Sequence, residues 1–321
     1  MYARRVGLRR SAWAIRTFAY HAAYNVLAGT APRVASAIQR LTHDTGRGRG
    51  RDGKAAADYF EAVLADYLAI AHASGVGGMD LFRGKHVLEL GPGDTRAFAL
   101  LARLEGATWE GFDPFDIQSQ HLPYLDAIYD PILVRRNEPR SVEECLQGAI
   151  VHTSATGLRR GGRRFQIIVS RAVLEHVRDL ESLFELASSV ATDDAVWIHK
   201  IDLRAHGIRH EHELDFLRFR EPVWNIMSSH IDLPNRARAA AHLDLGDRVG
   251  LRTLWAAATH VIPRDEADRV RNELASPFCA MDADALSVLG LWLVQVGRGH
   301  PRASQGSKKL VAAPTERLSR Y

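Results

Sequence analysis

The sequence predicts an α/β fold in which a mostly parallel sheet carries helices on both faces. From residue 85 onward, short runs of strand type alternate with longer helical patterns, as expected for parallel strands joined by right-handed crossovers. The chain of 321 residues is long enough to bury a large core. Its contents of 46% hydrophobic and 25% charged residues are those of an ordinary globular protein, which excludes a fibrous or wholly disordered chain.

The expected elements follow the chain in three segments. Residues 1–52 form a basic helical arm and a flexible Gly/Arg linker, residues 53–298 form the main domain, and residues 299–321 form a disordered basic tail. In the main domain, strands are expected at 86–90, 108–112, 165–170, 195–203, 250–262 and 289–296, with a further strand near 132–135 or 149–152. Helices are expected at 58–73, 95–104, 235–244 and 265–274, with an inserted helical segment at 204–234.

The N-terminal arm is the most basic part of the chain. Residues 1–51 contain ten arginines and one acid, Asp44, and aromatic residues such as Trp13 and Phe18 are interleaved with the arginines. This composition is compatible with peripheral contact on an anionic membrane surface or with an organellar presequence. The simpler interpretation is a packing arm or lid. Nucleic acid is not an expected partner, because no recognised reader motif accompanies the charge.

Cysteine content and hydropathy limit the expected location of the protein. Cys145 and Cys279 are the only cysteines, and they have no Cys-x-x-Cys spacing that would suggest a zinc site or a disulfide framework. No run of about 20 apolar residues is present, so no membrane-spanning segment is expected. We therefore expect a cytoplasmic protein, with the basic arm as its one route to a membrane surface.

The most informative motif is the predicted strand 86–90 followed by Gly91-Pro92-Gly93-Asp94-Thr95. The two glycines let the backbone approach a ligand closely, Glu89 is able to accept from an ammonium group, and Asp113 from ribose hydroxyls. A dinucleotide site is disfavoured because Arg96 stands where its third glycine would be, and the Gly-Lys-Ser/Thr of a phosphate-binding loop is absent. The pattern therefore favours a nucleoside with an amino-acid tail.

These residues resemble the class I S-adenosylmethionine-dependent methyltransferases. The first family motif matches residues 88–93, Asp113 matches the ribose-binding acid, and residues 170–177 are similar to the ubiquinone-biosynthesis subgroup. The resemblance implies a Rossmann-like sheet of seven strands with a reversed last strand. It also implies S-adenosyl-L-methionine as the cofactor. The residues that it implies for cofactor binding are Glu89, Gly91, Gly93, Asp94, Asp113, Ser170 and Arg171, with Asp94 alternatively capping the next helix.

Two groups of residues compete for the role of catalytic base. An oxygen acceptor benefits from a base that removes its proton, and histidine serves well near neutral pH. His176 follows the predicted strand 165–170, whereas Asp202 and His206 lie at the carboxyl end of the strand 195–203 and are our first candidates. With His210 and His212 they suggest a divalent cation, but the spacing matches no strict metal motif. Solvated loop histidines are the alternative, and we expect no metal site.

The acceptor is predicted from the region beyond residue 199. Residues 199–204, 216–219 and 235–236 resemble methyltransferases of glycan and polysaccharide biosynthesis, and aromatic and arginine side chains in the insertion are able to form either an acceptor pocket or a small core. We expect an O-methyltransferase acting on a sugar hydroxyl of a glycan, glycolipid or small metabolite. The alternatives are a membrane-associated methyltransferase of a quinone-like or lipid acceptor, and a non-catalytic binding module.

Overall fold

The structure is a computed structural model that describes residues 2–31, 34–35, 53–93, 95–114, 125–231, 233–307 and 309–312. These residues divide into two compact units, which are treated one at a time below. The sheet unit contains residues from 53–202, 240–260 and 290–312. The helical unit contains residues from 2–35, 203–239 and 261–289.

The sheet unit is built on one sheet of eight strands within the described part of the chain, in the order β3-β2-β1-β4-β5-β7-β6-β8. Strands β1 to β5 pair in parallel, and β7 runs antiparallel to β5. The predicted Rossmann-like sheet with a reversed strand is therefore confirmed. The strands are β1 His86–Leu90, β2 Thr108–Phe112, β3 Ile150–His152, β4 Phe165–Arg171, β5 Ala191–Asp202, β6 Arg252–Val261, β7 Val288–Val296 and β8 Leu310–Ala312.

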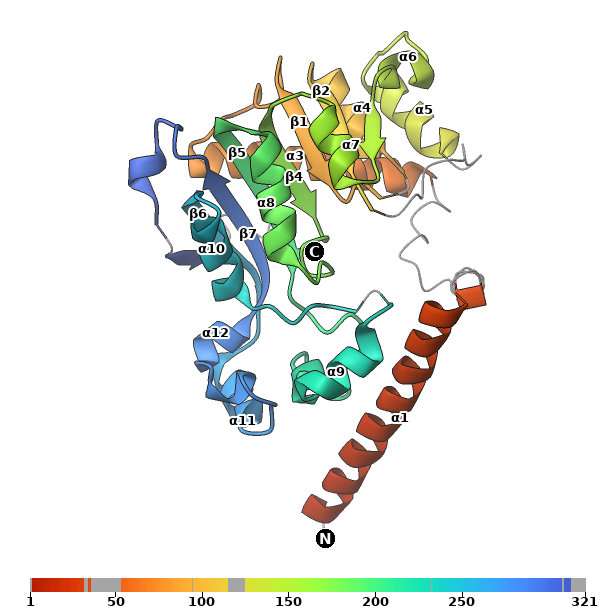
Figure 1. Cartoon of the computed structure of the whole chain (residues 1–321), viewed down its shortest axis with the longest axis vertical. Helices are drawn as coiled ribbons and strands as arrows, with labels where there is room; N and C mark the ends of the chain where they lie inside the picture. The colour runs from red at the N-terminus through yellow and green to blue at the C-terminus, as the bar shows by residue number, and fades with distance from the viewer. Residues whose placement is uncertain are drawn as a thin grey trace. The chain divides into compact units, whose positions relative to one another are not determined.

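Helices cover both faces of this sheet. On one face, Tyr67 of α3 (Gly53–Ser74) packs against Trp292 of β7, with ring centroids 5.7 Å apart. On the other, Phe184 of α8 (Leu180–Val190) packs against Trp197 of β5 at 5.4 Å. Figure 1 shows α3 and α8 on opposite sides of the strands. The remaining helical elements of the unit are α4 Ala97–Leu104, α5 Asp126–Arg135, α6 Val142–Leu146, α7 Ala155–Arg160, α10 Ala239–Arg248 and the 3-10 turn η4 Ala303–Gln305.

Tertiary contacts decide between two alternatives and correct one expectation. The third strand lies at residues 150–152, which confirms the second of the two predicted positions, and residues 132–135 belong to helix α5. Part of the tail expected to be disordered is ordered, because β8 pairs in parallel with residues 256–258 of β6. Backbone pairing of this kind depends on a partner distant in sequence, so local composition does not reveal it. Asp94 and the linker residues 46–52 lie outside the described residues.

The helical unit has a small core of its own. Helix α1 (Tyr2–Thr30) lies beside α9 (Glu221–Ser228), where the Asn25 amide donates to Ile226 O and Ser229 Oγ at 2.9 and 2.7 Å. The other helical elements are η2 Asp215–Arg218, α11 Arg264–Arg271, η3 Phe278–Ala280 and α12 Ala283–Ser287. Among the described residues, no helix combines the length and apolar character needed to cross a bilayer.

Candidate functional site

The candidate site lies at the carboxyl ends of β1, β2 and β4. Strand β2 lies on one side of β1 and β4 lies on its other side, so the strand order reverses at β1. The ladder extends one residue past the strands, since Gly91 N–H donates to Phe112 O at 2.9 Å and Asp113 N–H donates to His152 O at 3.0 Å. The predicted glycine loop and Asp113 are therefore held at the edge where α/β sheets bind ligands.

The two glycines of the loop serve different purposes. Both have positive φ, +65° for Gly91 and +66° for Gly93, a conformation that favours glycine. A Cβ on Gly91 would lie 2.5 Å from Val173 Cγ2, so Gly91 is required by packing against the segment after β4. Among the described residues, a Cβ on Gly93 would meet no atom within 4 Å. The backbone at Gly93 therefore borders open space that a ligand is able to enter.

Glu89 is a half-buried acid on β1, and its partner was not identified from the sequence. Burial raises the pKa of Glu89 to about 8, and this effect outweighs the opposing hydrogen bond from Trp109 Nε1–H, which is 3.0 Å long. Trp109 reaches Glu89 because Gly111 pairs with Glu89 in the sheet and leaves room for the indole ring. Residues 109 and 111 lie on the same face of β2, and residue 111 pairs with residue 89. This pairing is the signal from which the contact between Trp109 and Glu89 could have been predicted.

Asp113 is buried at the end of β2, with 7% of its surface exposed. Glu89 and Asp113 thus end neighbouring strands, and the open backbone of Gly93 follows β1 in the same loop. Glu89 is protonated near neutral pH in the absence of a cation, because its pKa is near 8. A bound ammonium group would favour the ionised form. This edge is therefore suited to a ligand that carries both hydroxyl and ammonium groups.

The side chains of Ser170 and Arg171 point to opposite faces of the sheet. Ser170 is fully buried on the face covered by α8, where its Oγ shares a 2.7 Å hydrogen bond with His199 Nδ1. Arg171 turns toward α3, where Nη1 lies 3.2 Å from Asp66 Oδ2 and the guanidinium is 5.5 Å from the centre of the Trp292 ring. Ser170 is therefore able to meet a ligand at this edge only through its backbone, and Arg171 ties α3 to the end of β4.

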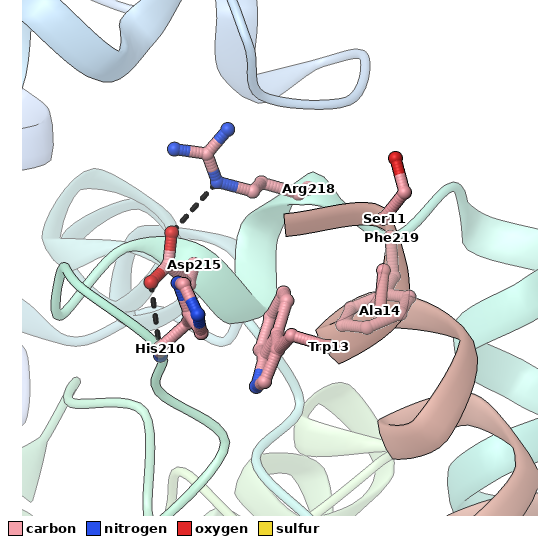
Figure 2. A pocket seen from close by; sticks show the side chains of 7 residues that line it. All are labelled: Ser11, Trp13, Ala14, His210, Asp215, Arg218 and Phe219. Carbon is pink, nitrogen blue, oxygen red and sulfur yellow. Dashed lines mark hydrogen bonds and ion pairs between the residues drawn. The ribbon is translucent and has the colours of Figure 1, made fainter. Parts of the chain in front are cut away.

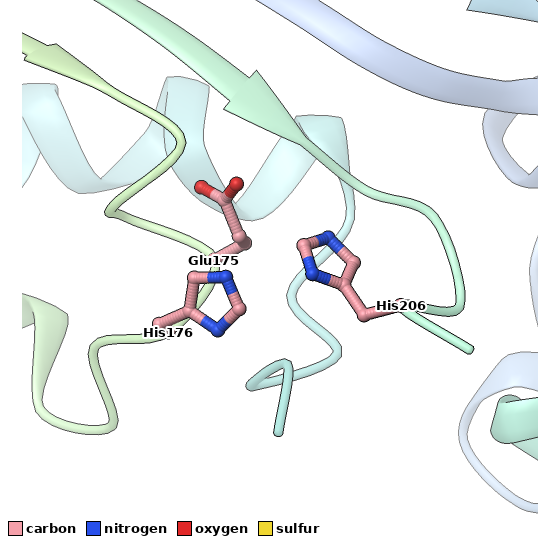
Figure 3. A group of neighbouring side chains, drawn as sticks. All are labelled: Glu175, His176 and His206. Atoms are coloured by element: carbon pink, nitrogen blue, oxygen red, sulfur yellow. The ribbon is translucent and has the colours of Figure 1, made fainter. Parts of the chain in front are cut away.

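Among the catalytic candidates, the sheet unit holds His176 and Asp202. His176 follows β4 and Asp202 is the last residue of β5, and Asp202 N–H donates to Glu175 Oε1 at 3.3 Å, so the ends of β4 and β5 are joined at this point. Glu175 is buried, whereas His176 and Asp202 are half-buried. Figure 3 shows Glu175 and His176 on the segment that follows β4 and His206 on the segment that follows β5. His206 is exposed, has a φ of +47° and belongs to the helical unit.

The histidine-rich segment 209–215 is organised around the carboxylate of Asp215. The backbone N–H groups of His210, Glu211 and His212 donate to Asp215 Oδ2 at 3.0, 2.8 and 2.8 Å, and Arg218 Nε donates to Oδ1 at 2.7 Å. Burial opposes ionisation of Asp215, but these donors together outweigh it and hold its pKa below the usual value. The carboxylate therefore fixes the shape of this loop.

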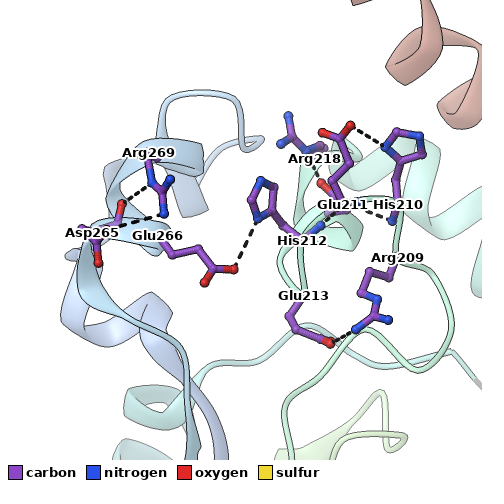
Figure 4. Close-up of polar contacts among 10 residues, drawn as sticks. Arg209, His210, Glu211, His212, Glu213, Arg218, Asp265, Glu266 and Arg269 are labelled. Carbon is purple, nitrogen blue, oxygen red and sulfur yellow. Dashed lines mark hydrogen bonds and ion pairs between the residues drawn. The ribbon is translucent and has the colours of Figure 1, made fainter. Parts of the chain in front are cut away.

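The imidazoles of the same segment have separate partners. His212 Nδ1 lies 3.4 Å from Glu266 Oε1, and Figure 4 shows the two side chains facing each other. The His210 ring lies 5.5 Å from the Trp13 ring of α1. A small pocket in the helical unit, drawn in Figure 2, is bordered by Ser11, Trp13, Ala14, His210, Asp215, Arg218 and Phe219.

Most aromatic and arginine residues of the insertion form a core. Phe216, Leu217, Trp224 and Met227 are buried together. Arg236 stacks on Trp224 with its Cζ 4.8 Å from the ring centre. Arg238 donates to the carbonyl oxygens of Leu203, Leu286 and Val288. The sequence predicted either an acceptor pocket or a small core for this region. These residues form a core, and the pocket of Figure 2 lies beside them in the same unit.

Comparisons with solved structures give low-identity matches. A magnesium protoporphyrin IX methyltransferase from Synechocystis PCC 6803 is 12% identical, with a TM-score of 0.42, and the match covers 85% of this chain and 97% of that one. An S-adenosylmethionine-dependent methyltransferase from Mesorhizobium loti is also 12% identical, with a TM-score of 0.37 and coverage of 67% and 92%. These similarities are too distant to assign a substrate.

The family assignment rests on the sequence itself. No curated protein matches the chain. The family model described as a methyltransferase domain matches residues 58–251, which is more than half of the chain and includes the glycine loop, Asp113 and the ends of β4 and β5. The chain therefore belongs to the methyltransferase domain family.

Proposed function

We propose that the protein is an S-adenosylmethionine-dependent O-methyltransferase that acts on a sugar hydroxyl of a glycan, glycolipid or small metabolite. The observation that carries the first half of this proposal is the open backbone of Gly93 at the strand edge that also holds Glu89 and Asp113. The acceptor half rests on the sequence similarity of residues 199–204, 216–219 and 235–236 to methyltransferases of glycan biosynthesis.

The residues present fit S-adenosylmethionine. Open space at Gly93 allows its backbone to approach the methionine part, Glu89 is placed to accept from the ammonium group, and Asp113 is placed to accept from the ribose hydroxyls. Gly91 contributes by letting Val173 pack behind the loop. S-adenosylmethionine is the methyl donor, and when bound it supplies a methyl group already activated as a sulfonium. The protein's main task is therefore alignment of the two reactants.

An acceptor hydroxyl also requires a group to receive its proton. His206 is the first candidate, because its imidazole is exposed and follows β5 by four residues. Asp202 would orient the acceptor, since its backbone is anchored to Glu175 while its carboxylate remains half-buried. His176 is the alternative base. Proton transfer to a well-placed imidazole is worth about 10²- to 10⁴-fold in rate.

The pocket of the helical unit supports a sugar as the acceptor. The rings of Trp13 and Phe219 lie 5.6 Å apart and border the pocket together with His210 and Arg218. Aromatic faces pack against the apolar face of a pyranose ring, and the nitrogen atoms of the histidine and arginine side chains are able to bind its hydroxyls. We propose this pocket as a contact site for a glycan acceptor.

Two experiments test the cofactor assignment and the acceptor assignment separately. Calorimetric titration with S-adenosylhomocysteine, with and without magnesium or manganese, should show micromolar binding, and absence of binding under every condition would overturn the cofactor assignment. Methyl transfer from labelled S-adenosylmethionine should then be measured with glycan, glycolipid and quinone acceptors. Transfer to quinones but not to sugars, with cofactor binding intact, would overturn the acceptor assignment alone. A rate that depends on added metal would promote Asp202 and His206 to ligands.

A further inference from the structure

Helix α1 has one face that packs within the helical unit. Trp13 and Phe18 contact the core of that unit, and Asn25 is buried and bonded to the residues at the end of α9. Ala14, Phe18 and Asn25 are spaced four and seven residues apart, so they occupy one side of the helix, and Trp13 adjoins that side. This face accounts for the docking of α1 within its own unit.

The opposite side of α1 is also apolar, but it is exposed. Ile15 is 69% exposed and Val26 is 59% exposed. Between and beside them lie exposed alanines, so the full stripe is Ala12, Ile15, Ala19, Ala23 and Val26. These positions recur every three or four residues and form a continuous line along the helix. With apolar residues on both sides, α1 lacks the one-sided pattern of an ordinary surface helix, which explains its irregular sequence.

The charge of α1 indicates what the exposed stripe contacts. Within Tyr2–Thr30 there are five arginines and no acidic residue, and four of the arginines (Arg4, Arg5, Arg9 and Arg10) belong to the first third of the helix. The fifth, Arg16, is exposed next to Ile15. Apolar side chains that enter the headgroup region, combined with arginines that meet anionic lipids, are typical of interfacial helices.

We propose that the stripe of Ala12, Ile15, Ala19, Ala23 and Val26 docks α1 in the plane of an anionic lipid bilayer. In this proposal the helix lies on the surface, since α1 is long but not apolar enough to be a candidate membrane span. One face of α1 holds the helical unit while the other enters the headgroup region. This surface is independent of the chemistry at the ends of β1, β2 and β4.

The test is flotation of the full chain with phosphatidylcholine vesicles and with vesicles that also contain phosphatidylglycerol. The protein should float with the anionic vesicles only, and added salt should weaken the association. The double variant Ile15→Glu/Val26→Glu should lower vesicle partitioning by about tenfold or more, since it places two charges in the stripe. The matched control is Val134→Glu, which adds a charge at a site that is 75% exposed on α5 of the sheet unit, and it should leave partitioning unchanged.

Three results would overturn the proposal. The first is equal flotation of the wild type and the double variant, and the second is no flotation of the wild type. The third is a concentration-dependent dimer in light scattering that the double variant dissociates while vesicles have no effect, which would assign the stripe to a second copy of the chain. Wild-type far-ultraviolet circular dichroism and thermal unfolding of both variants show that each is folded, and this control does not depend on cofactor binding or enzymatic activity.

Discussion

Polar residues are arranged differently in two loops of the molecule. One loop follows β1, and the other is formed by residues 209–215. In the first, Gly93 leaves its backbone next to open space, and Asp113 ends the neighbouring strand. In the second, the carboxylate of Asp215 takes up three backbone N–H groups and the Arg218 guanidinium. The second loop contains more donors and acceptors than the first, but they are engaged with one another.

The difference shows that the density of polar residues is a poor guide to the cofactor site. The Asp215 carboxylate is already hydrogen-bonded within the fold, so it gains little from a ligand that would have to replace an existing partner. Open space next to a rigid backbone is more informative. The contrast leads to five predictions, which begin with the largest expected effect.

Loss of the acid at the end of β2 should have the largest effect on the cofactor. Asp113→Ala removes the proposed acceptor for two ribose hydroxyls, so the affinity for S-adenosylhomocysteine should fall about 100-fold, or about 2.7 kcal/mol, in calorimetric titration. Asp130→Ala changes an exposed acid on α5 and should leave the affinity unaltered. Equal affinities for Asp113→Ala and the wild type would remove Asp113 from the site.

Loss of the Asp215 charge should affect stability and not cofactor binding. Asp215→Asn weakens four hydrogen bonds to a buried side chain, which should lower the free energy of unfolding by about 2 kcal/mol. Urea denaturation followed by tryptophan fluorescence measures this change. A wild-type unfolding curve together with a loss of S-adenosylhomocysteine binding would contradict the structural role assigned to Asp215.

A pair of glycine variants separates backbone strain from ligand contact. Gly93 and Gly148 both have positive φ, and a Cβ at either position would meet no atom within 4 Å. Alanine at either position should therefore lower the free energy of unfolding by a similar amount, about 1–2 kcal/mol. Only Gly93→Ala should also weaken S-adenosylhomocysteine binding, by about tenfold, because its methyl group enters the space used by the ligand. Equal binding by the two variants would place the ligand elsewhere.

The smallest effect is a proton released when the cofactor binds. Glu89 is largely protonated at pH 7 because burial raises its pKa to about 8, and an ammonium group beside it should ionise it. Calorimetry in buffers of different ionisation enthalpy should show release of about one proton per ligand at pH 7. Glu89→Gln should abolish the release, and an undiminished release from this variant would assign the proton to another group.

The raised pKa of Glu89 also determines how this residue affects the free energy of unfolding in the absence of ligand. Below the ordinary glutamate pKa of 4.5 the group is protonated in both the folded and the unfolded chain. As the pH rises from 4.5 to about 8, the unfolded chain ionises first, so the contribution of Glu89 to stability falls. In urea denaturation, the free energy of unfolding of Glu89→Gln should fall less steeply over that pH interval.

The sequence determined the elements with strong local patterns. Strands β1 and β2 have the predicted limits, and the glycine pair and Asp113 lie at the predicted edge. A parallel strand buried on both faces is recognisable as a run of apolar residues, and a glycine turn has few conformational alternatives. These features depend on residues that are close in sequence.

The tertiary structure decided the features that depend on partners distant in sequence. Ser170 faces His199 and not the open edge, because alternation along β4 directs its side chain toward α8. The segment 310–312 becomes a strand only because β6 offers it a pairing edge. Helix α1 has two apolar faces, and only packing shows which one is buried. Local sequence sets the pattern of polar and apolar residues, and the partner that each face meets is fixed by the whole chain.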